Sequence, residues 1–438
     1  MKRLIGKSGR LALAMCSALG IGSAFVSQPS AFAQSAPHIT LTVSTWDSGN
    51  GLVAYKRGIA YFEKENPNIK VQIESIPWNY YMPKILTQMA NGSAPDLMLV
   101  GDDNMPAFMK SGMISSLNFM FTPKYHLSVN DFIPNSFYIG NKPGAIYFVP
   151  KDAEDANVIY NKAMFKAAHL AFPKPGWTWQ QFINDAKRLT IKRSGRTVQW
   201  GALLPGTGLR SGIEELANEW GGRILSANGK TASGYLNSRA TQNAIKFYVN
   251  MYTQDHISPT PSQTASFGNI DLFMTGKVAL EPTGSWNLEE YRQDPHLQYG
   301  VVPMPLGPTH KPTTVTWTAG WALYSRTQNR DAAVKLLRFF ASRKWASIND
   351  YWGIPVRKDP QVDAQMIKQD PAISVFLQQR KYIAPLETTQ TMNWSKDVQP
   401  ALQQMLEQAI LKPNSNVSSL IQQAAKQIDS NLQQDYTQ

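Results

Sequence analysis

Residues 39–101 alternate short apolar strands with amphipathic helical segments, and this order restricts the fold more than any other feature. Apolar residues at every second position predict strands at 39–43 and 69–76, and a short apolar run predicts a third at 97–100. Helical spacing of apolar residues predicts helices at 51–65 and 78–91, with Gly92 as a carboxyl-terminal cap. This order is typical of a parallel sheet covered by helices, so we expect an α/β fold.

Aromatic and acidic residues follow two of these strands directly. Trp46 and Asp47 come after the first strand, and Asp102 and Asp103 come after the third. In open α/β sheets, ligands bind beyond the carboxyl ends of the strands. The sequence therefore predicts a binding site at this edge.

The pattern restarts after Tyr147, and 438 residues are too many for one ordinary core. Thr178 followed by Gln181 predicts a capping box that starts a helix. Helical periodicity returns at 213–222, 241–254 and 331–342, and again from Val398 to Leu432. Two α/β domains without a low-complexity linker suggest that the chain crosses between them more than once.

Residues 1–33 have the pattern of a secretory signal peptide. A basic start is followed by a short apolar run and an A-x-A pattern that ends at Ala33. The single cysteine, Cys16, lies inside this segment after Met15, which disfavours a lipoprotein box. We expect an exported, soluble product with no disulfide and no thiolate metal site.

Several classes of site are disfavoured by the residue patterns. The glycines of residues 205–212 do not fit a dinucleotide or nucleotide loop, and the six histidines are scattered, so we expect no cofactor and no metal. The net charge of +12 is spread without a Lys/Arg run, so we expect no nucleic-acid partner.

Carboxylates and aromatic residues allow more than one interpretation. Asp102 with Asp103, or Asp152 with Glu154 and Asp155, could be a glycosidase acid/base pair, solvated loop charges, or acceptors for sugar hydroxyls. Five tryptophans stand in predicted turns beside strands, and a flat ring can pack on the apolar face of a pyranose. They are Trp46, Trp286, Trp317, Trp321 and Trp352.

The chain resembles the sugar-binding branch of the extracellular solute-binding proteins of ABC importers, the group around maltose-binding protein. The resemblance rests on blocks in the family's order, including "LTVSTWDSG", "ILTQMANGSAPDLMLVGDD", "IYFVPKDAEDANVIYNKAMFKAA", "PGWTWQQFINDAKRLT", "DLFMTGKVALEPTGSW", "TAGWALYSRTQNRDAAVKLLRFFAS" and "GIPVRKD". Lys151 and Asn157 depart from the family, where many members carry an aromatic and a small residue.

This resemblance implies a two-lobe periplasmic-binding-protein fold with three interdomain crossings and a ligand cleft between the lobes. The expected first lobe comprises residues 37–148 and 317–346, and the second comprises 149–316 and 347–438. The resemblance also implies a non-enzymatic, monomeric receptor in the periplasm, or at the cell surface if there is no outer membrane. It would bind a mono- or oligosaccharide and deliver it to membrane-embedded ABC permease subunits.

The site residues expected from strand ends, aromatic turns and the resemblance form one set. It comprises Trp46, Asp47, Tyr81, Asp102, Asp103, Asp152, Trp286, Gly320, Trp321, Trp352 and Arg357. Two competing functions stay open: a binding protein for a non-sugar solute such as a glycerol phosphodiester, and a secreted glycoside hydrolase. The phosphodiester alternative requires a basic pocket at the cleft, for which Arg357 is the one candidate.

Overall fold

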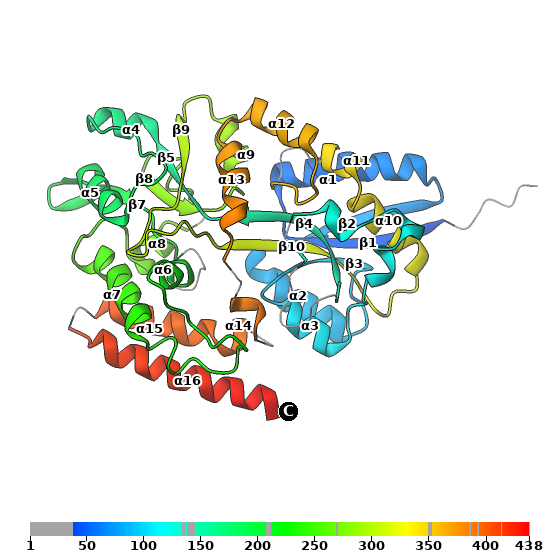
Figure 1. Ribbon diagram of the computed structural model, residues 1–438. Helices are drawn as coiled ribbons and strands as arrows, with labels where there is room; N and C mark the ends of the chain where they lie inside the picture. Colours follow the sequence, from blue (N-terminus) through cyan, green and yellow to red (C-terminus); the bar gives the residue numbers. More distant parts are fainter. Residues whose placement is uncertain are drawn as a thin grey trace, which may run out of the picture. The chain divides into compact units, whose positions relative to one another are not determined.

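A computed structural model of the chain contains two five-stranded sheets (Figure 1). The structure describes residues 38–133, 136–137, 145–206, 212–268, 270–348, 353–384, 387–391, 394–412 and 414–437. The predicted signal peptide at 1–33 lies outside these residues. Residues 38–438 form one compact unit, which contains both sheets.

The first sheet contains the predicted strand–helix–strand–helix–strand unit. Strands β1 (Ile39–Thr45), β2 (Ile69–Ser75) and β3 (Leu97–Gly101) pair in parallel. They alternate with α1 (Gly49–Glu65) and α2 (Trp78–Ala90). Gly92 follows α2 with φ +70°, the left-handed conformation that glycine adopts without a steric penalty, so its predicted capping role is confirmed.

Two further strands of the first sheet run antiparallel to their neighbours. Strand β10 (Thr316–Leu323) lies between β3 and β4 (Phe148–Asp155), giving the order β2-β1-β3-β10-β4. The hydrogen-bond register shifts where Ala319 faces Asp152 and Gly320 faces Pro150. This bulge leaves Lys151 as the extra residue of β4, and bulges redirect side chains at such points.

The second sheet has the order β6-β7-β8-β5-β9 and is mostly antiparallel. Its strands are β5 (Asn157–Asn161), β6 (Ile191–Arg193), β7 (Arg196–Ala202), β8 (Val278–Thr283) and β9 (Tyr299–Pro303). Helix α5 (Trp179–Leu189) starts with the predicted capping box, in which Thr178 and Gln181 each accept a backbone N–H from the other. Further helices between its strands are α4 (Lys162–Ala167), α6 (Ile213–Glu219), α7 (Arg239–Thr253), α8 (Pro261–Ser266) and α9 (Leu288–Gln293).

The remaining helices divide between the hydrophobic cores. Helix α10 (Arg330–Phe340) and the Trp345 side chain of α11 (Arg343–Ile348) join the core of the first sheet. Buried residues from the carboxyl-terminal helices join the cores of the second sheet. These helices are α12 (Pro360–Gln369), α13 (Ile373–Gln379), α14 (Trp394–Asp397), α15 (Gln399–Leu411) and α16 (Val417–Thr437). Short helices complete the chain: α3 (Met105–Ser111), η1 (Asn118–Met120), η2 (Pro123–Tyr125), η3 (Val129–Asp131), η4 (Arg380–Tyr382) and η5 (Glu387–Thr389).

The chain passes between the sheets at identifiable residues. It leaves the first sheet at Ala156, between β4 and β5, and returns between Pro303 and Thr316. The first passage is later in the chain than the lobe boundary expected at residues 148 and 149, because all of β4 belongs to the first sheet. A further passage expected after residue 346 involves residues 349–352, which lie outside the described part.

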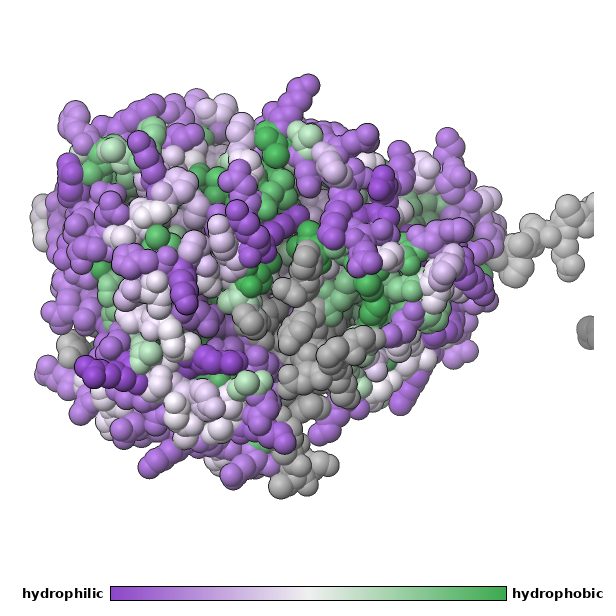
Figure 2. Space-filling view, in the orientation of Figure 1, coloured by the Kyte–Doolittle hydropathy of each residue, from purple (hydrophilic) through white to green (hydrophobic). Residues whose placement is uncertain are grey.

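The face shown in Figure 2 is mostly hydrophilic, with small, separate hydrophobic areas. Among the described helices, none combines the length and the apolar character that a membrane span requires.

Candidate functional site

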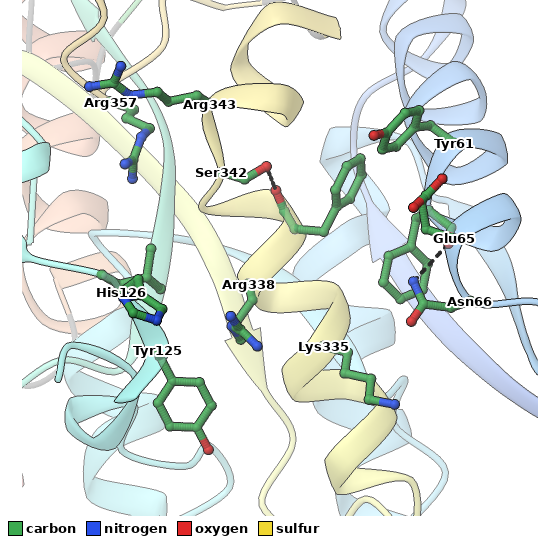
Figure 3. A pocket seen from close by; sticks show the side chains of 13 residues that line it. Tyr61, Glu65, Asn66, Tyr125, His126, Lys335, Arg338, Ser342, Arg343 and Arg357 are labelled. Atoms are coloured by element: carbon green, nitrogen blue, oxygen red, sulfur yellow. Dashed lines mark hydrogen bonds between the residues drawn. The ribbon is translucent and has the colours of Figure 1, made fainter. Parts of the chain in front are cut away.

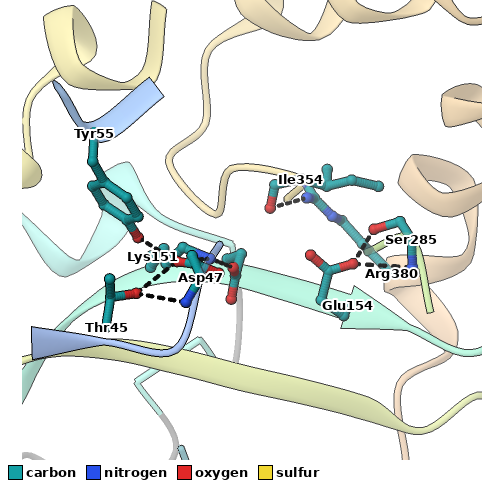
Figure 4. A network of polar contacts seen from close by, with 9 residues as sticks. Thr45, Asp47, Tyr55, Lys151, Glu154, Ser285, Ile354 and Arg380 are labelled. Atoms are coloured by element: carbon teal, nitrogen blue, oxygen red, sulfur yellow. Dashed lines mark hydrogen bonds and ion pairs between the residues drawn. The ribbon is translucent and has the colours of Figure 1, made fainter. Parts of the chain in front are cut away.

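A buried polar cluster connects the end of β1 to the bulge of β4 (Figure 4). The Asp47 carboxylate accepts hydrogen bonds from the hydroxyls of Thr45 (2.9 Å) and Tyr55 (2.8 Å). Lys151 lies with its Nζ 3.4 Å from Asp47 and pairs with Asp152, the next residue. Because Lys151 is the extra residue of the bulge, one ammonium group can bridge the carboxylate that follows β1 and the carboxylate of Asp152 in β4.

Charge pairing outweighs burial at Lys151, whereas burial outweighs it at Asp152, whose pKa is raised. Burial alone would lower the pKa of Lys151, but the Asp152 and Asp47 carboxylates raise it overall. The pKa of Tyr55 is also raised, by burial and by the charge of Asp47, so the phenol keeps the proton that it donates. Lys151 therefore stays cationic and Tyr55 neutral, which fixes the cluster's hydrogen-bond pattern.

Glu154 connects β4 to the loop after β8. The Ser285 amide donates to the Glu154 carboxylate at 3.0 Å, and the Ser285 hydroxyl donates to the same oxygen. Gly353 packs on this group, because a Cβ at its position would lie 3.0 Å from Glu154 and 2.8 Å from Asp152. Burial and the neighbouring Asp152 charge raise the pKa of Glu154 to about 7.

The raised pKa of Glu154 predicts a pH-dependent contribution to stability. From the ordinary value of 4.5 to about 7, the folded protein retains a proton that the unfolded chain has lost. The free energy of unfolding should therefore fall as the pH rises through this window, and this contribution should level off above it. In Glu154→Gln the side chain no longer titrates, so the fall should be smaller.

Urea unfolding of both proteins between pH 4.5 and 8, without ligand, measures this difference. Asp155 and Glu281 also have raised pKa values, of about 6 and about 8, but they contribute equally in both proteins. Parallel stability curves for wild type and Glu154→Gln would show that Glu154 does not titrate in this window.

The residue after Ser285 is Trp286, which is 37% exposed. It contacts the Trp317 ring of β10 edge to face, with the centroids 5.1 Å apart and the planes at 82°. The ring lies close over Gly284, where any Cβ would overlap it. Glycine at 284 therefore permits the position of the ring, and the aromatic pair Trp286–Trp317 joins elements of both sheets.

A second aromatic group lies where β1 ends. The half-buried Trp46 contacts both Trp78 and Tyr81 edge to face, with each pair of centroids 5.0 Å apart. Trp78 is 57% exposed, whereas Tyr81 is fully buried and its hydroxyl bonds to Ser44. Trp46 and Trp78 can therefore contact a ligand, but Tyr81 supports them from below.

The two carboxylates after β3 differ in their surroundings. Asp102 is buried and accepts a hydrogen bond from the Thr318 amide at 3.1 Å, next to Trp317. Asp103 is half-buried and accepts a hydrogen bond from the Asn104 side chain at 2.8 Å. Asp102 therefore holds the start of β10 in place, and Asp103 is the more accessible acceptor.

Several predicted site residues lie elsewhere. Trp321 is 1% exposed and packs against Tyr55 and Phe340, so the prediction that it offers a ring to a ligand is contradicted. Gly320 is a packing residue, because a Cβ there would overlap the Phe148 ring. Asp152 was expected in the second lobe, but it belongs to the first sheet.

Arg357 and Trp352 are the remaining predicted site residues. The Arg357 guanidinium pairs with Asp131 at 3.3 Å, and within the described residues no hydrogen bond or ion pair joins it to Glu154 or Asp152. It lines a pocket with residues of α1, η2 and α10, whereas the sequence placed it at the ligand cleft. Trp352 lies outside the described residues.

Sequence reasoning missed three features of this site. Trp317 was noted as a turn tryptophan but not selected, and Trp78 was assigned only to a helix. The contact between Glu154 and Ser285 joins residues 131 positions apart and has no local signal. For Trp317, the available signal was its position at the start of a strand, where a ring can extend beyond the sheet.

The His, Cys, Asp and Glu side chains in the described part of the chain are not arranged as ligands of a metal ion. No group of three or more His, Cys, Asp or Glu side chains there is arranged to hold one. Within the polar cluster, the Asp47 and Asp152 carboxylates already pair with Lys151.

Comparison with known proteins agrees with this architecture. The model of the bacterial extracellular solute-binding protein family matches residues 30–347. A multiple sugar-binding protein of Streptococcus mutans is 25% identical over 319 residues, which cover 69% of this chain and 71% of that protein.

Two solved structures have the same fold. One is an ABC substrate-binding protein from Listeria monocytogenes in complex with cycloalternan, with a TM-score of 0.81, 21% identity and coverage of 90% of this chain and 99% of the other. The second is a maltose/maltodextrin-binding domain from Bdellovibrio bacteriovorus bound to maltotriose, with a TM-score of 0.74, 20% identity and coverage of 91% and 100%.

Proposed function

We propose that this chain, which belongs to the bacterial extracellular solute-binding proteins, captures a carbohydrate outside the cytoplasm and delivers it to an ABC importer. The aromatic pair Trp286–Trp317 is the observation that carries the proposal. A pyranose has an apolar C–H face that packs on an indole ring, while its hydroxyls need hydrogen-bond partners at the edge. An indole that is 37% exposed and fixed against a second indole offers such a face.

The spacing along β4 supports a ligand longer than one ring. Lys151 is bound to the loop that carries Trp46, and Glu154 is bound to the loop that carries Trp286. Lys151 and Glu154 are three strand residues apart, which corresponds to about 10 Å between the points on β4 that hold the two loops. We therefore assign contacts with the sugar faces to the two aromatic groups, and contacts with hydroxyls to Asp103. Asp47, Asp102 and Asp152 hold these elements in position.

The relatives agree with a carbohydrate ligand. One is named a multiple sugar-binding protein, and the solved structures of similar fold hold cycloalternan and maltotriose. The pattern of a signal peptide at residues 1–33 supports export to the periplasm or the cell surface. Membrane-embedded ABC permease subunits are the partners that this function requires.

The competing functions have less support. A phosphodiester ligand requires cations beside the aromatic pair, but Lys151 is buried against carboxylates, and the Arg380 guanidinium donates to the carbonyls of Ile354 and Pro355. A glycoside hydrolase would use Glu154 as its acid, but this carboxyl is 7% exposed and bonded to Ser285. Family membership also favours binding over hydrolysis.

A thermal-unfolding screen with mono-, di- and trisaccharides tests the proposal. A ligand at a hundred times its dissociation constant should stabilise the protein by about 2.7 kcal/mol, because it binds only the folded state. At least one carbohydrate should raise the melting temperature and be recovered unchanged. The proposal fails if glycerol phosphodiesters stabilise the protein and carbohydrates do not, or if a bound oligosaccharide is cleaved.

A further inference from the structure

A pocket, which we call the basic pocket, lies between the end of α1, helix α10 and the turn η2 (Figure 3). Its volume is about 490 Å³, and small-molecule sites have about 300–1,000 Å³. The side chains that give it its chemical character are Tyr61, Tyr125, Lys335, Arg338, Arg343 and Arg357.

The basic pocket is separate from the candidate carbohydrate site. Both sites involve α1, but at different points along the helix. Tyr55 contacts Asp47 in the polar cluster, whereas Tyr61 and Glu65 line the basic pocket six and ten residues later. At 1.5 Å per residue these positions are about 9 and 15 Å further along the helix axis.

Cationic side chains outnumber carboxylates in the pocket lining. Four lysine and arginine side chains line it with one carboxylate, that of Glu65. Arg357 pairs with Asp131 at 3.3 Å, and the exposed Arg343 lies 3.8 Å from Asp359. In the part of the chain that the structure describes, Lys335 and Arg338 have no carboxylate within 4 Å. Like charges gathered in one concavity attract an anion.

Aromatic rings hold two of these guanidinium groups. Arg338 lies over the Tyr125 ring, 5.3 Å from its centroid, and Arg357 lies 5.5 Å from the centroid of Phe132. Arg357 also donates from Nη1 to the Ala341 carbonyl at 2.8 Å, but its buried Nε has no hydrogen-bond partner in the described structure. Guanidinium groups positioned by stacking keep N–H donors for a planar or tetrahedral anion.

We propose that the basic pocket binds a phosphomonoester. Such a group carries a charge of about −1.5 to −2 at neutral pH and three strong acceptor oxygens, and so can engage several guanidinium and ammonium donors at once. A ligand with a single carboxylate would neutralise only one of the pocket's cations. Tyr61, which is 38% exposed, and Phe339, on which its ring stacks, give the organic part of the ester an apolar surface, with the Lys344 ammonium 4.9 Å from the Tyr61 ring centroid. This binding function goes beyond carbohydrate capture. The phosphomonoester belongs either to a soluble phosphorylated compound or to a phosphatidate headgroup.

Calorimetric titration with phenyl phosphate tests the soluble source. The double variant Lys335→Gln/Arg338→Gln should lower the affinity for phenyl phosphate at least tenfold. It removes the two pocket cations that have no carboxylate within 4 Å among the described residues. The control variant Lys246→Gln/Lys368→Gln removes two exposed lysines from α7 and α12, and so changes the net charge equally. The control should bind phenyl phosphate like the wild type, and carbohydrate affinity should be unchanged in both variants.

Co-sedimentation with phosphatidylcholine vesicles tests the lipid source. One vesicle set contains phosphatidic acid, a phosphomonoester, and the other contains phosphatidylglycerol, a diester, at equal surface charge. Binding to phosphatidic acid that only the pocket variant loses would support the proposal and assign it to a lipid. Equal binding to both vesicle sets, with pocket-dependent binding of phenyl phosphate, would assign the pocket to a soluble compound. The proposal is overturned if neither phenyl phosphate nor phosphatidic acid binds, or if the pocket and control variants lose that binding alike.

Discussion

Replacing Trp321 with alanine should lower the free energy of unfolding by about 3–5 kcal/mol, the usual cost of removing a buried tryptophan. The side chain is 1% exposed. Its ring packs edge to face on Tyr55, with the centroids 5.4 Å apart, and at a 32° tilt on Phe340, with the centroids 4.9 Å apart, so truncation leaves a cavity inside the first sheet's core. Urea unfolding without ligand measures the loss.

Two comparisons separate packing from ligand contact at this position. Trp321→Phe should recover much of the stability, because it refills most of the cavity and removes an indole N–H that has no partner within the described residues. At a temperature where Trp321→Ala is folded, its carbohydrate affinity should stay within a few-fold of wild type. A stable alanine variant that no longer binds carbohydrate would restore Trp321 to the binding site.

Replacing Trp286 with alanine should have the opposite effects: carbohydrate affinity should fall and stability without ligand should change little. Burying about 60–100 Å² of apolar surface against a sugar face contributes roughly 1.5–2.5 kcal/mol. Its loss should weaken carbohydrate affinity about ten- to seventyfold. The melting temperature without ligand should change little, because the ring is 37% exposed and its ring contact is with Trp317. Calorimetric titration and thermal unfolding of the same variant give both quantities.

Tyr235→Ala is the matched control for this substitution. Tyr235 has nearly the same exposure, 38%, and should have no effect on carbohydrate affinity. Gly284→Ala provides a second test, because the added methyl would overlap the Trp286 ring and force it to move. Its affinity should also fall although the indole is retained. A large loss of stability in Trp286→Ala with intact affinity would make Trp286 a packing residue.

Local sequence signals predicted the first sheet's parallel unit and several helix ends. Alternating apolar residues identified β1 and β2, and the capping box of Thr178 and Gln181 identified the start of α5. These features depend on residues a few positions apart, which a single sequence displays directly. The strand–helix alternation therefore sufficed for the fold class.

The insertion of β10 between β3 and β4 could not be predicted in the same way. The three strands begin at residues 97, 148 and 316, and their pairing depends on backbone hydrogen bonds between distant segments. The same limit applies to Trp317 and Trp321, which lie on one strand next to small residues. Packing by α1 and α10 buries Trp321, whereas Trp317 meets a loop of the second sheet.

The polar part of the site shows a related limit. The sequence placed Asp47 at a strand end and Asp152 in the second lobe, and both were expected to contact a ligand. The bulge at Lys151 instead places an ammonium group between them, so both carboxylates are paired inside the protein. A bulge depends on the register of two strands, which residue types in one strand do not reveal.

Fluorine NMR of protein labelled with 5-fluorotryptophan tests the carbohydrate-binding site most directly. The chain has 12 tryptophans, and single Trp→Phe variants assign the resonances of Trp286, Trp317 and Trp321. A carbohydrate that stabilises the protein should shift the Trp286 and Trp317 resonances in proportion to site occupancy and leave Trp321 nearly unchanged. A stabilising carbohydrate that leaves both the Trp286 and Trp317 resonances unmoved would contradict the assignment of this aromatic pair as the binding surface.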